Sequence, residues 1–169
     1  MMIRTSRPLV LKRAFFGSSK PQSYSISRVL NGSPEQVFDI VSRVDNYKNF
    51  VPFVEDSFIT SRDGGNLPSG AGLKIGWNDI TERFVCKLHC EENRNVYAKS
   101  VELELFETLE TQWVFSHVST SKFPKCRVDF KLTYKFRNPL YNHLSSMFAP
   151  QVSNIMIGAF EKQLKQQQR

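Results

Sequence analysis

The chain has 169 residues, of which 40% are hydrophobic and 14 are phenylalanine, and this size and composition predict one globular domain that needs neither disulfides nor metals to form a core. Its formal net charge of +7 would suit nucleic-acid binding, but six basic residues precede the first acidic one, Glu35, which leaves 17 of the 23 basic residues against all 16 acidic ones. This nearly neutral body excludes the concentrated positive field that phosphate-dominated binding requires.

The first 20 residues, MMIRTSRPLVLKRAFFGSSK, contain arginine and serine but no acidic residue. This is the composition of a mitochondrial transit peptide, and the apolar run at 9–11 is too short for a secretory signal. We therefore interpret residues 1–20 as a transit peptide that is cleaved near Phe15 or Phe16, and residues 21–169 as the domain. The alternative is a disordered basic tail on a cytosolic protein.

The domain begins with a predicted strand and a capped helix. Residues 22–30 mix apolar and small polar side chains in alternation, which is typical of an edge strand. Ser33 fits the N-cap of the helix, Pro34 fits its first turn, and Gln36 completes a capping box. Residues 45–57, DNYKNFVPFVEDS, follow directly as a predicted loop with an unusually high apolar content.

A succession of strands follows. They are predicted at 57–62, 72–79, 81–92, 95–106, 111–119 and 125–136. In the last strand, apolar residues from Cys126 to Phe136 alternate with charged and polar ones, so one side of the sheet is dry and the other is wet. Short spacing between strands predicts an antiparallel meander, and the glycine-rich residues 63–72 are interpreted as a turn.

From residue 138 the apolar period becomes helical. Asn138 and Pro139 predict the cap and first turn, and Pro150 predicts a bend or a division of the helix. No formally charged residue lies between Asn138 and Phe160, but asparagine, serine and proline make this segment too polar to span a membrane. Its uncharged outer face either lies against a membrane surface or a partner, or is an ordinary solvated face.

No arrangement of residues predicts catalysis or metal binding. His89, His117 and His143 lie far apart in the sequence without metal-ligand spacing. Cys90 follows His89, but neighbours on a strand point to opposite faces. The three cysteines lack a CxxC pair and are interpreted as buried thiols. What remains is a set of inward-facing apolar side chains, which suits a water-insoluble ligand held without any reactive residue.

Three segments resemble one known family. They are SPEQVFDIVSRVDNYKNFVPFVEDS, CRVDFKLTYKFRNPL and VSNIMIGAFEKQL. Together with the W-x-F strand at Trp113 and Phe115, they are similar to the coenzyme Q-binding START-domain proteins of mitochondria, in the polyketide cyclase and lipid transport superfamily. The resemblance covers residues 22–165. Residues 104–112 depart from it, because they lack the glycine-rich turn expected there.

The resemblance implies an α+β helix-grip fold, in which a curved antiparallel sheet wraps around the long C-terminal helix and leaves a hydrophobic tunnel. It implies ubiquinone (coenzyme Q) as the bound ligand, with no cofactor, no metal and no nucleic acid. It further implies a lipid chaperone or transfer protein, not an enzyme, that supports respiration and efficient quinone biosynthesis. Such a protein lies peripherally on the matrix side of the mitochondrial inner membrane, with quinone-biosynthesis proteins or a second copy of the chain as further partners.

The predicted ligand-binding residues are inward-facing positions of the strands and the C-terminal helix, together with the apolar loop. Tyr134 or a backbone group would orient a quinone carbonyl, in a pocket of about 300 to 1,000 Å³. The loop would form a gate or dip into lipid; the alternative is that it packs as core on the C-terminal helix. The full set is Phe50, Val51, Pro52, Phe53, Leu73, Ile75, Trp77, Phe84, Leu88, Trp113, Phe115, Phe130, Leu132, Tyr134, Leu144, Phe148, Val152 and Met156.

Two other functions are compatible with this fold, which alone does not decide between them. The first is a polyketide cyclase or aromatase, which needs polar residues inside the tunnel. The second is a ribosome or protein interaction module, for which the nearly neutral body is unfavourable.

Overall fold

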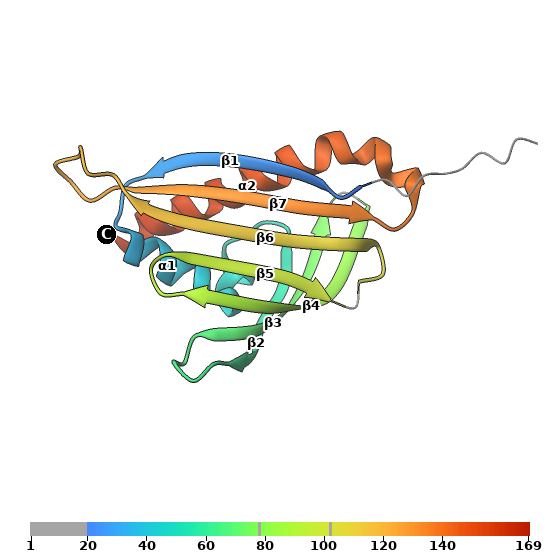
Figure 1. The fold of residues 1–169 in the computed structure, drawn as a ribbon, viewed down its shortest axis with the longest axis horizontal. Helices are drawn as coiled ribbons and strands as arrows, with labels where there is room; N and C mark the ends of the chain where they lie inside the picture. Colours follow the sequence, from blue (N-terminus) through green and yellow to red (C-terminus); the bar gives the residue numbers. More distant parts are fainter. Residues whose placement is uncertain (1–19, 78, 102) are drawn as a thin grey trace, which may run out of the picture.

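A computed structural model describes residues 20–77, 79–101 and 103–169, and the side chains at 80, 140 and 142–146 also lie outside its description. A seven-stranded antiparallel sheet curves around one long helix (Figure 1), which confirms the expected helix-grip class. The elements are β1 (Gln22–Leu30), α1 (Pro34–Ser42), the 3-10 helix η1 (Val44–Asn49), β2 (Val54–Arg62), β3 (Pro68–Trp77), β4 (Ile80–Glu91), β5 (Asn95–Val101), β6 (Phe106–His117), β7 (Cys126–Phe136), the 3-10 helix η2 (Pro139–Tyr141) and α2 (Asn142–Gln167).

The strand order is β1-β7-β6-β5-β4-β3-β2, so the chain from β2 to β7 forms the predicted meander and β1 returns beside β7. The predicted faces of β7 are also confirmed. Every second side chain from Cys126 to Phe136 is buried, and those between are exposed or half-buried. Because pairing is regular between β1 and β7, and between β7 and β6 from Thr108 onward, the dry faces of these strands form one continuous surface.

Both predicted helices are present. Ser33 caps α1: its hydroxyl accepts from the Gln36 backbone N–H at 3.3 Å, and the Gln36 side chain accepts from the Ser33 N–H at 2.9 Å. α2 is not divided at Pro150, so that alternative was wrong. The proline lacks the N–H that would donate to the carbonyl oxygen four residues earlier, yet the helix continues through it. The Asn154 side chain donates to the Pro150 carbonyl oxygen at 2.7 Å.

The strand predicted at 95–106 ends earlier, at Val101, and β6 begins at Phe106. Two charged side chains, the buried Glu82 and the exposed Arg137, hold residues 103–106. The Glu82 carboxylate accepts from the backbone N–H groups of Glu104 and Leu105 at 2.7 and 2.9 Å. The Arg137 guanidinium donates to the carbonyl oxygens of the same segment, residues 103–106, at 3.0 to 3.5 Å. These bonds replace the sheet pairing that the alternation pattern predicted.

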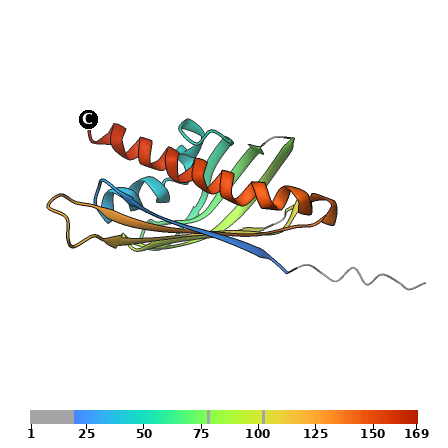
Figure 2. The ribbon, with the colours of Figure 1, turned by 90° about the horizontal axis from the view of Figure 1, so that it is seen from above.

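Helix α2 lies along one face of the sheet (Figure 2) and packs on β1, β7 and α1. The strands β3, β4 and β5 face the helix from farther away, because the sheet curves. No helix in the described part of the chain is long and apolar enough to cross a membrane.

Candidate functional site

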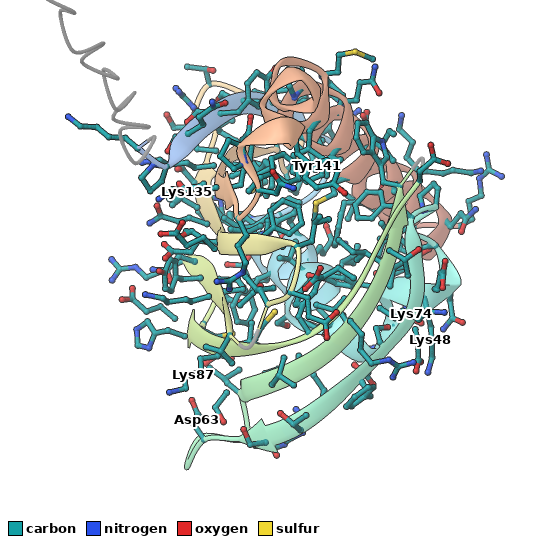
Figure 3. All side chains as sticks on the ribbon, turned by 90° about the vertical axis from the view of Figure 1, so that its right-hand side faces the viewer. Lys48, Asp63, Lys74, Lys87, Lys135 and Tyr141 are labelled. Carbon is teal, nitrogen blue, oxygen red and sulfur yellow. The ribbon has the colours of Figure 1, made fainter. Side chains whose placement is uncertain are left out.

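An apolar cavity occupies the space between α2 and the curved sheet. It holds about 90 Å³ that the centre of a water molecule can reach, which is less than the pocket size expected from the sequence. Figure 3 looks along this space, with side chains from both layers projecting into it and Lys87 pointing away on the outer side of the sheet. The lining consists of Val44, Tyr47, Phe53, Val54, Leu73, Ile75, Phe84, Cys86, Leu88, Val96, Ala98, Ser100, Leu109, Thr111, Trp113, Leu132, Phe148, Val152 and Met156.

The lining follows from the period of two residues along a strand and of 3.6 residues along a helix. Strand residues at every second position share the inner face, as with Ala98 and Ser100 on β5. Helix residues four apart share one side of α2, as with Phe148, Val152 and Met156. Because β5 presents the short side chains of alanine and serine opposite the helix, the layers do not fill the space between them.

Aromatic rings close the cavity at two places. Trp77, behind the lining at the end of β3, meets Phe148 of α2 edge-on, with ring centroids 5.3 Å apart. Trp113 meets Phe130 and Phe160 with centroid distances of 4.6 and 4.8 Å. The cavity is thus bounded by rings that belong to the helix on one side and to the sheet on the other.

The apolar segment after α1 lies partly on the cavity lining and partly in core contact with α2, while a gate or a lipid contact stays a prediction. Tyr47 lines the cavity, and its buried hydroxyl donates to the Val41 carbonyl oxygen at the end of α1. Phe50 packs edge-on against Tyr47 and against Phe160, each with ring centroids within 6 Å. Phe53 is half-buried and lines the cavity. The predicted loop is shorter than expected, because η1 and β2 take up most of it.

Ten of the eighteen predicted ligand-binding residues lie on the cavity lining. They are Phe53, Leu73, Ile75, Phe84, Leu88, Trp113, Leu132, Phe148, Val152 and Met156. Their geometric position agrees with the expectation, while their contact with a ligand stays a prediction.

The other eight do not form part of the lining described here. Val51 is buried and Pro52 is exposed. Phe115 packs edge-on against Phe38 of α1, outside the cavity. Tyr134 donates its hydroxyl to the Gln22 side chain at 2.9 Å, so this hydroxyl is engaged at the β1 edge instead of pointing at a ligand. Phe50, Trp77 and Phe130 pack in the aromatic contacts above, and the side chain of Leu144 lies outside the described residues.

Nine lining residues were absent from the predicted set. They are Val44, Tyr47, Val54, Cys86, Val96, Ala98, Ser100, Leu109 and Thr111. Alternation along 95–101 and 106–113 could have found five of them, since each lies two residues from another inward position. Small or polar types such as Ala98, Ser100 and Thr111 gave no apolar signal, although they leave the space that makes the cavity.

The lining contains no aspartate, glutamate, histidine, lysine or arginine. Burial raises the pKa of the Cys86 thiol to about 11, and the Ser100 hydroxyl lies 3.5 Å from its sulfur. Burial also raises the pKa of the Tyr47 hydroxyl far above its usual value. At neutral pH the described lining is therefore uncharged, with hydroxyl and thiol groups as its polar side-chain atoms. No metal-binding cluster of histidine, cysteine or carboxylate is present among the described residues.

Comparison with known proteins gives three kinds of match. The family model described as polyketide cyclase / dehydrase and lipid transport matches residues 30–161. The mitochondrial coenzyme Q-binding protein COQ10 of Eremothecium gossypii is 39% identical over 93% of this chain and 81% of its own length. The Saccharomyces cerevisiae protein of the same name is 32% identical, over 90% of this chain and 78% of its own.

Solved structures show the same fold at low sequence identity. A START superfamily protein from Mycobacterium smegmatis has a TM-score of 0.77 with 16% identity, covering 85% of this chain and 97% of that one. The Zhui aromatase/cyclase from Streptomyces has a TM-score of 0.77 with 10% identity, covering 89% and 97%. These two likenesses concern the fold alone.

Proposed function

Because the chain belongs to the polyketide cyclase / dehydrase and lipid transport family, and within it to the group of mitochondrial coenzyme Q-binding proteins, we propose that it binds coenzyme Q in the cavity between α2 and the sheet. The observation that carries this proposal is the uncharged, largely apolar lining of that cavity. Burial of a ligand's apolar surface is favourable by about 25 cal/mol per Å², so such a lining binds a quinone without any reactive group.

The quinone ring needs more room than the described cavity offers. Pockets that enclose drug-sized ligands measure about 300 to 1,000 Å³, against about 90 Å³ here. In our proposal the lining opens when the ring enters. Met156, a flexible half-buried side chain, is suited to moving aside. The polyprenyl tail then extends out of the cavity.

Hydroxyl groups on the sheet side are suited to orient the ring. Ser100 on β5 and Thr111 on β6 are both half-buried and line the cavity. A hydroxyl donates to a quinone carbonyl, and it can also accept from a quinol. In our proposal these groups replace Tyr134 as the polar contacts of the ring.

We propose that the protein carries or delivers the quinone and does not convert it chemically. A cyclase needs a group that takes up or releases protons in its tunnel near neutral pH. Cys86 does not suit this role, because the high pKa of its thiol keeps it protonated. The names of the relatives also describe coenzyme Q binding and name no reaction.

The proposed place of action is the matrix side of the mitochondrial inner membrane, where the protein would act as a lipid chaperone that supports respiration and quinone biosynthesis. Coenzyme Q is a membrane-soluble lipid, so its carrier must touch the bilayer. Residues 1–20 form the proposed transit peptide; their structure up to residue 19 lies outside the described part of the chain.

The test is mass spectrometry of lipids that copurify with the protein from mitochondria. We expect coenzyme Q with the natural chain and at least tenfold less with Leu88→Glu, which places a charge on the lining. Val85→Glu is the matched control, because Val85 lies on the outer face of the same strand and is 38% exposed. Circular dichroism checks that both variants fold.

A preparation free of quinone from quinone-replete mitochondria would overturn the proposal. Equal loss of quinone in the two folded variants would also contradict it, because the effect would then not depend on the cavity.

A further inference from the structure

The β6–β7 loop, residues 118–125, carries a side chain that the fold leaves uncovered. Phe123 is 70% exposed, more than any other large apolar side chain in the described part of the chain. Figure 1 shows the loop projecting beyond the end of the sheet, at the end of the molecule where α1 and the C-terminus lie. An exposed aromatic ring at a projecting tip is unfavourable in water unless it meets an apolar environment elsewhere.

The loop is closed at its base and holds this ring outward. The Val118 backbone N–H donates to the Lys125 carbonyl oxygen at 3.1 Å, which joins the two ends of the loop. The Lys122 ammonium lies 5.9 Å from the centroid of the Phe123 ring. The ring therefore has a cation beside it and no place in the core.

The charges around Phe123 have one sign. Lys122 and Lys125 flank the ring, and the loop contains no acidic residue. At its base, Glu35 of α1 is within 3.8 Å of His117, and Asp129 is within 3.2 Å of Arg127. The tip is thus basic, while Glu35 and Asp129 face partners on the body of the molecule.

An aromatic ring between two lysines suits the boundary of a bilayer that contains anionic phospholipids. Apolar side chains such as phenylalanine bind at the boundary between headgroups and acyl chains, and lysines there are attracted to anionic headgroups. One ring and two lysines offer far less area than the roughly 1,000 Å² that a specific protein interface needs. A bilayer has no such requirement, because it surrounds whatever part of the tip enters it.

We propose that the β6–β7 loop docks the protein on an anionic bilayer, with Phe123 inserted at the headgroup boundary and Lys122 and Lys125 on lipid phosphates. This proposal rests on the proposed function, which gives the protein a reason to bind a membrane. It adds the surface that makes the contact. A competing surface is the outer side of α2, where Met147 and Ile155 are 51% and 36% exposed.

The test is flotation of the full chain with vesicles of phosphatidylcholine, with and without phosphatidylglycerol. We expect binding to the anionic vesicles that weakens as salt is raised. Phe123→Ala should lower the bound fraction at least fivefold, and Lys122→Gln with Lys125→Gln should lower it similarly. Phe123→Trp should bind as well as the natural chain. Phe58→Ala is the matched control, because Phe58 is the other clearly exposed phenylalanine among the described residues, at 41%.

Three results would overturn the proposal: no binding of the natural chain to anionic vesicles, unchanged binding of Phe123→Ala, or loss of binding only in Met147→Ala and Ile155→Ala. Crosslinking from position 123 to a protein instead of a lipid in mitochondria would also overturn it. The quinone content of the Phe123 variant, measured in detergent, separates the two proposals. A variant that keeps quinone but no longer binds vesicles supports the proposal that this loop docks on the membrane. Absence of quinone from the natural chain and from every variant contradicts the proposed function alone.

Discussion

Helix α2 meets the rest of the molecule in two different ways. Toward its C-terminus, Ile157, Phe160 and Leu164 are at most 2% exposed, and the Phe160 ring has centroids of three other rings within 5.1 Å. Toward its middle, Val152 and Met156 border a cavity instead. The same apolar helix thus packs tightly toward its C-terminus and borders a cavity toward its middle.

The difference comes from what lies opposite the helix. The packed half faces aromatic rings of η1 and β6, whereas the cavity half faces Ala98 and Ser100 of β5, on the part of the sheet that curves away. An apolar stripe on a helix therefore marks burial, but the opposing side chains decide whether burial means packing or space.

The largest expected effect concerns the packed half. Phe160→Ala should lower the free energy of unfolding by about 3 to 5 kcal/mol, the usual cost of removing a buried phenylalanine. Met156→Ala, half-buried beside existing space, should cost only about 1 kcal/mol. Urea denaturation of both variants measures the difference. Equal losses would show that the two halves are packed alike, and the comparison would fail.

The next effect concerns the β5–β6 connection, which polar bonds hold in place. Glu82 is 3% exposed, and Glu82→Ala leaves two backbone N–H groups of the β5–β6 connection without their acceptor. We expect a loss of about 2 kcal/mol in the free energy of unfolding. Glu104→Ala, an exposed side chain on the same connection, should change it by less than about 0.5 kcal/mol. Similar values for both would mean that the Glu82 bonds contribute little.

Filling the cavity should weaken quinone binding while changing the free energy of unfolding only slightly. Ala98→Leu places a larger side chain in the space, so we expect quinone affinity to fall about tenfold, which corresponds to about 1.4 kcal/mol. The free energy of unfolding should change by less than about 1 kcal/mol, since the added methyl groups occupy existing room. Val101→Leu, on the outer face of β5, is the control for isothermal titration. Undiminished affinity in Ala98→Leu would place the ligand elsewhere.

The smallest effect concerns two buried thiols, of which one borders the cavity and the other lies in the packed part of the sheet. Burial raises the pKa of both Cys86, on the cavity, and Cys126, in the packed sheet, to about 11 from an ordinary 9.0. The unfolded chain loses these protons first as pH rises, so the free energy of unfolding should be constant below pH 9 and should fall toward pH 11.

Maleimide labelling at pH 8 distinguishes the two thiols. Cys86 should react slowly, and more slowly still when a quinone analogue is present, whereas Cys126 should stay unlabelled in either case. Mass spectrometry of the labelled peptides measures this. Labelling of Cys86 at the same rate with and without the analogue would argue against a ligand in the cavity.

Much of the fold could be predicted because its patterns are local. Alternation in β7 and the capping box of α1 each follow from side chains a few residues apart. The β5–β6 connection could not be predicted in this way, since Glu82 lies more than twenty residues from the N–H groups that it binds. For the candidate site, alternation and helical period placed nine residues on the lining and the apolar loop added Phe53, but alternation also included Phe115, which faces α1 instead.

By itself, the sequence determined which side of each strand and helix is apolar, because that depends only on the order of residue types along a period of two or of 3.6. The position of the empty space was decided only by the tertiary structure. It depends on how far the sheet curves from α2 and on which small side chains, Ala98 and Ser100 among them, then face the helix. Curvature is a property of the whole sheet, so no single segment of the chain contains it.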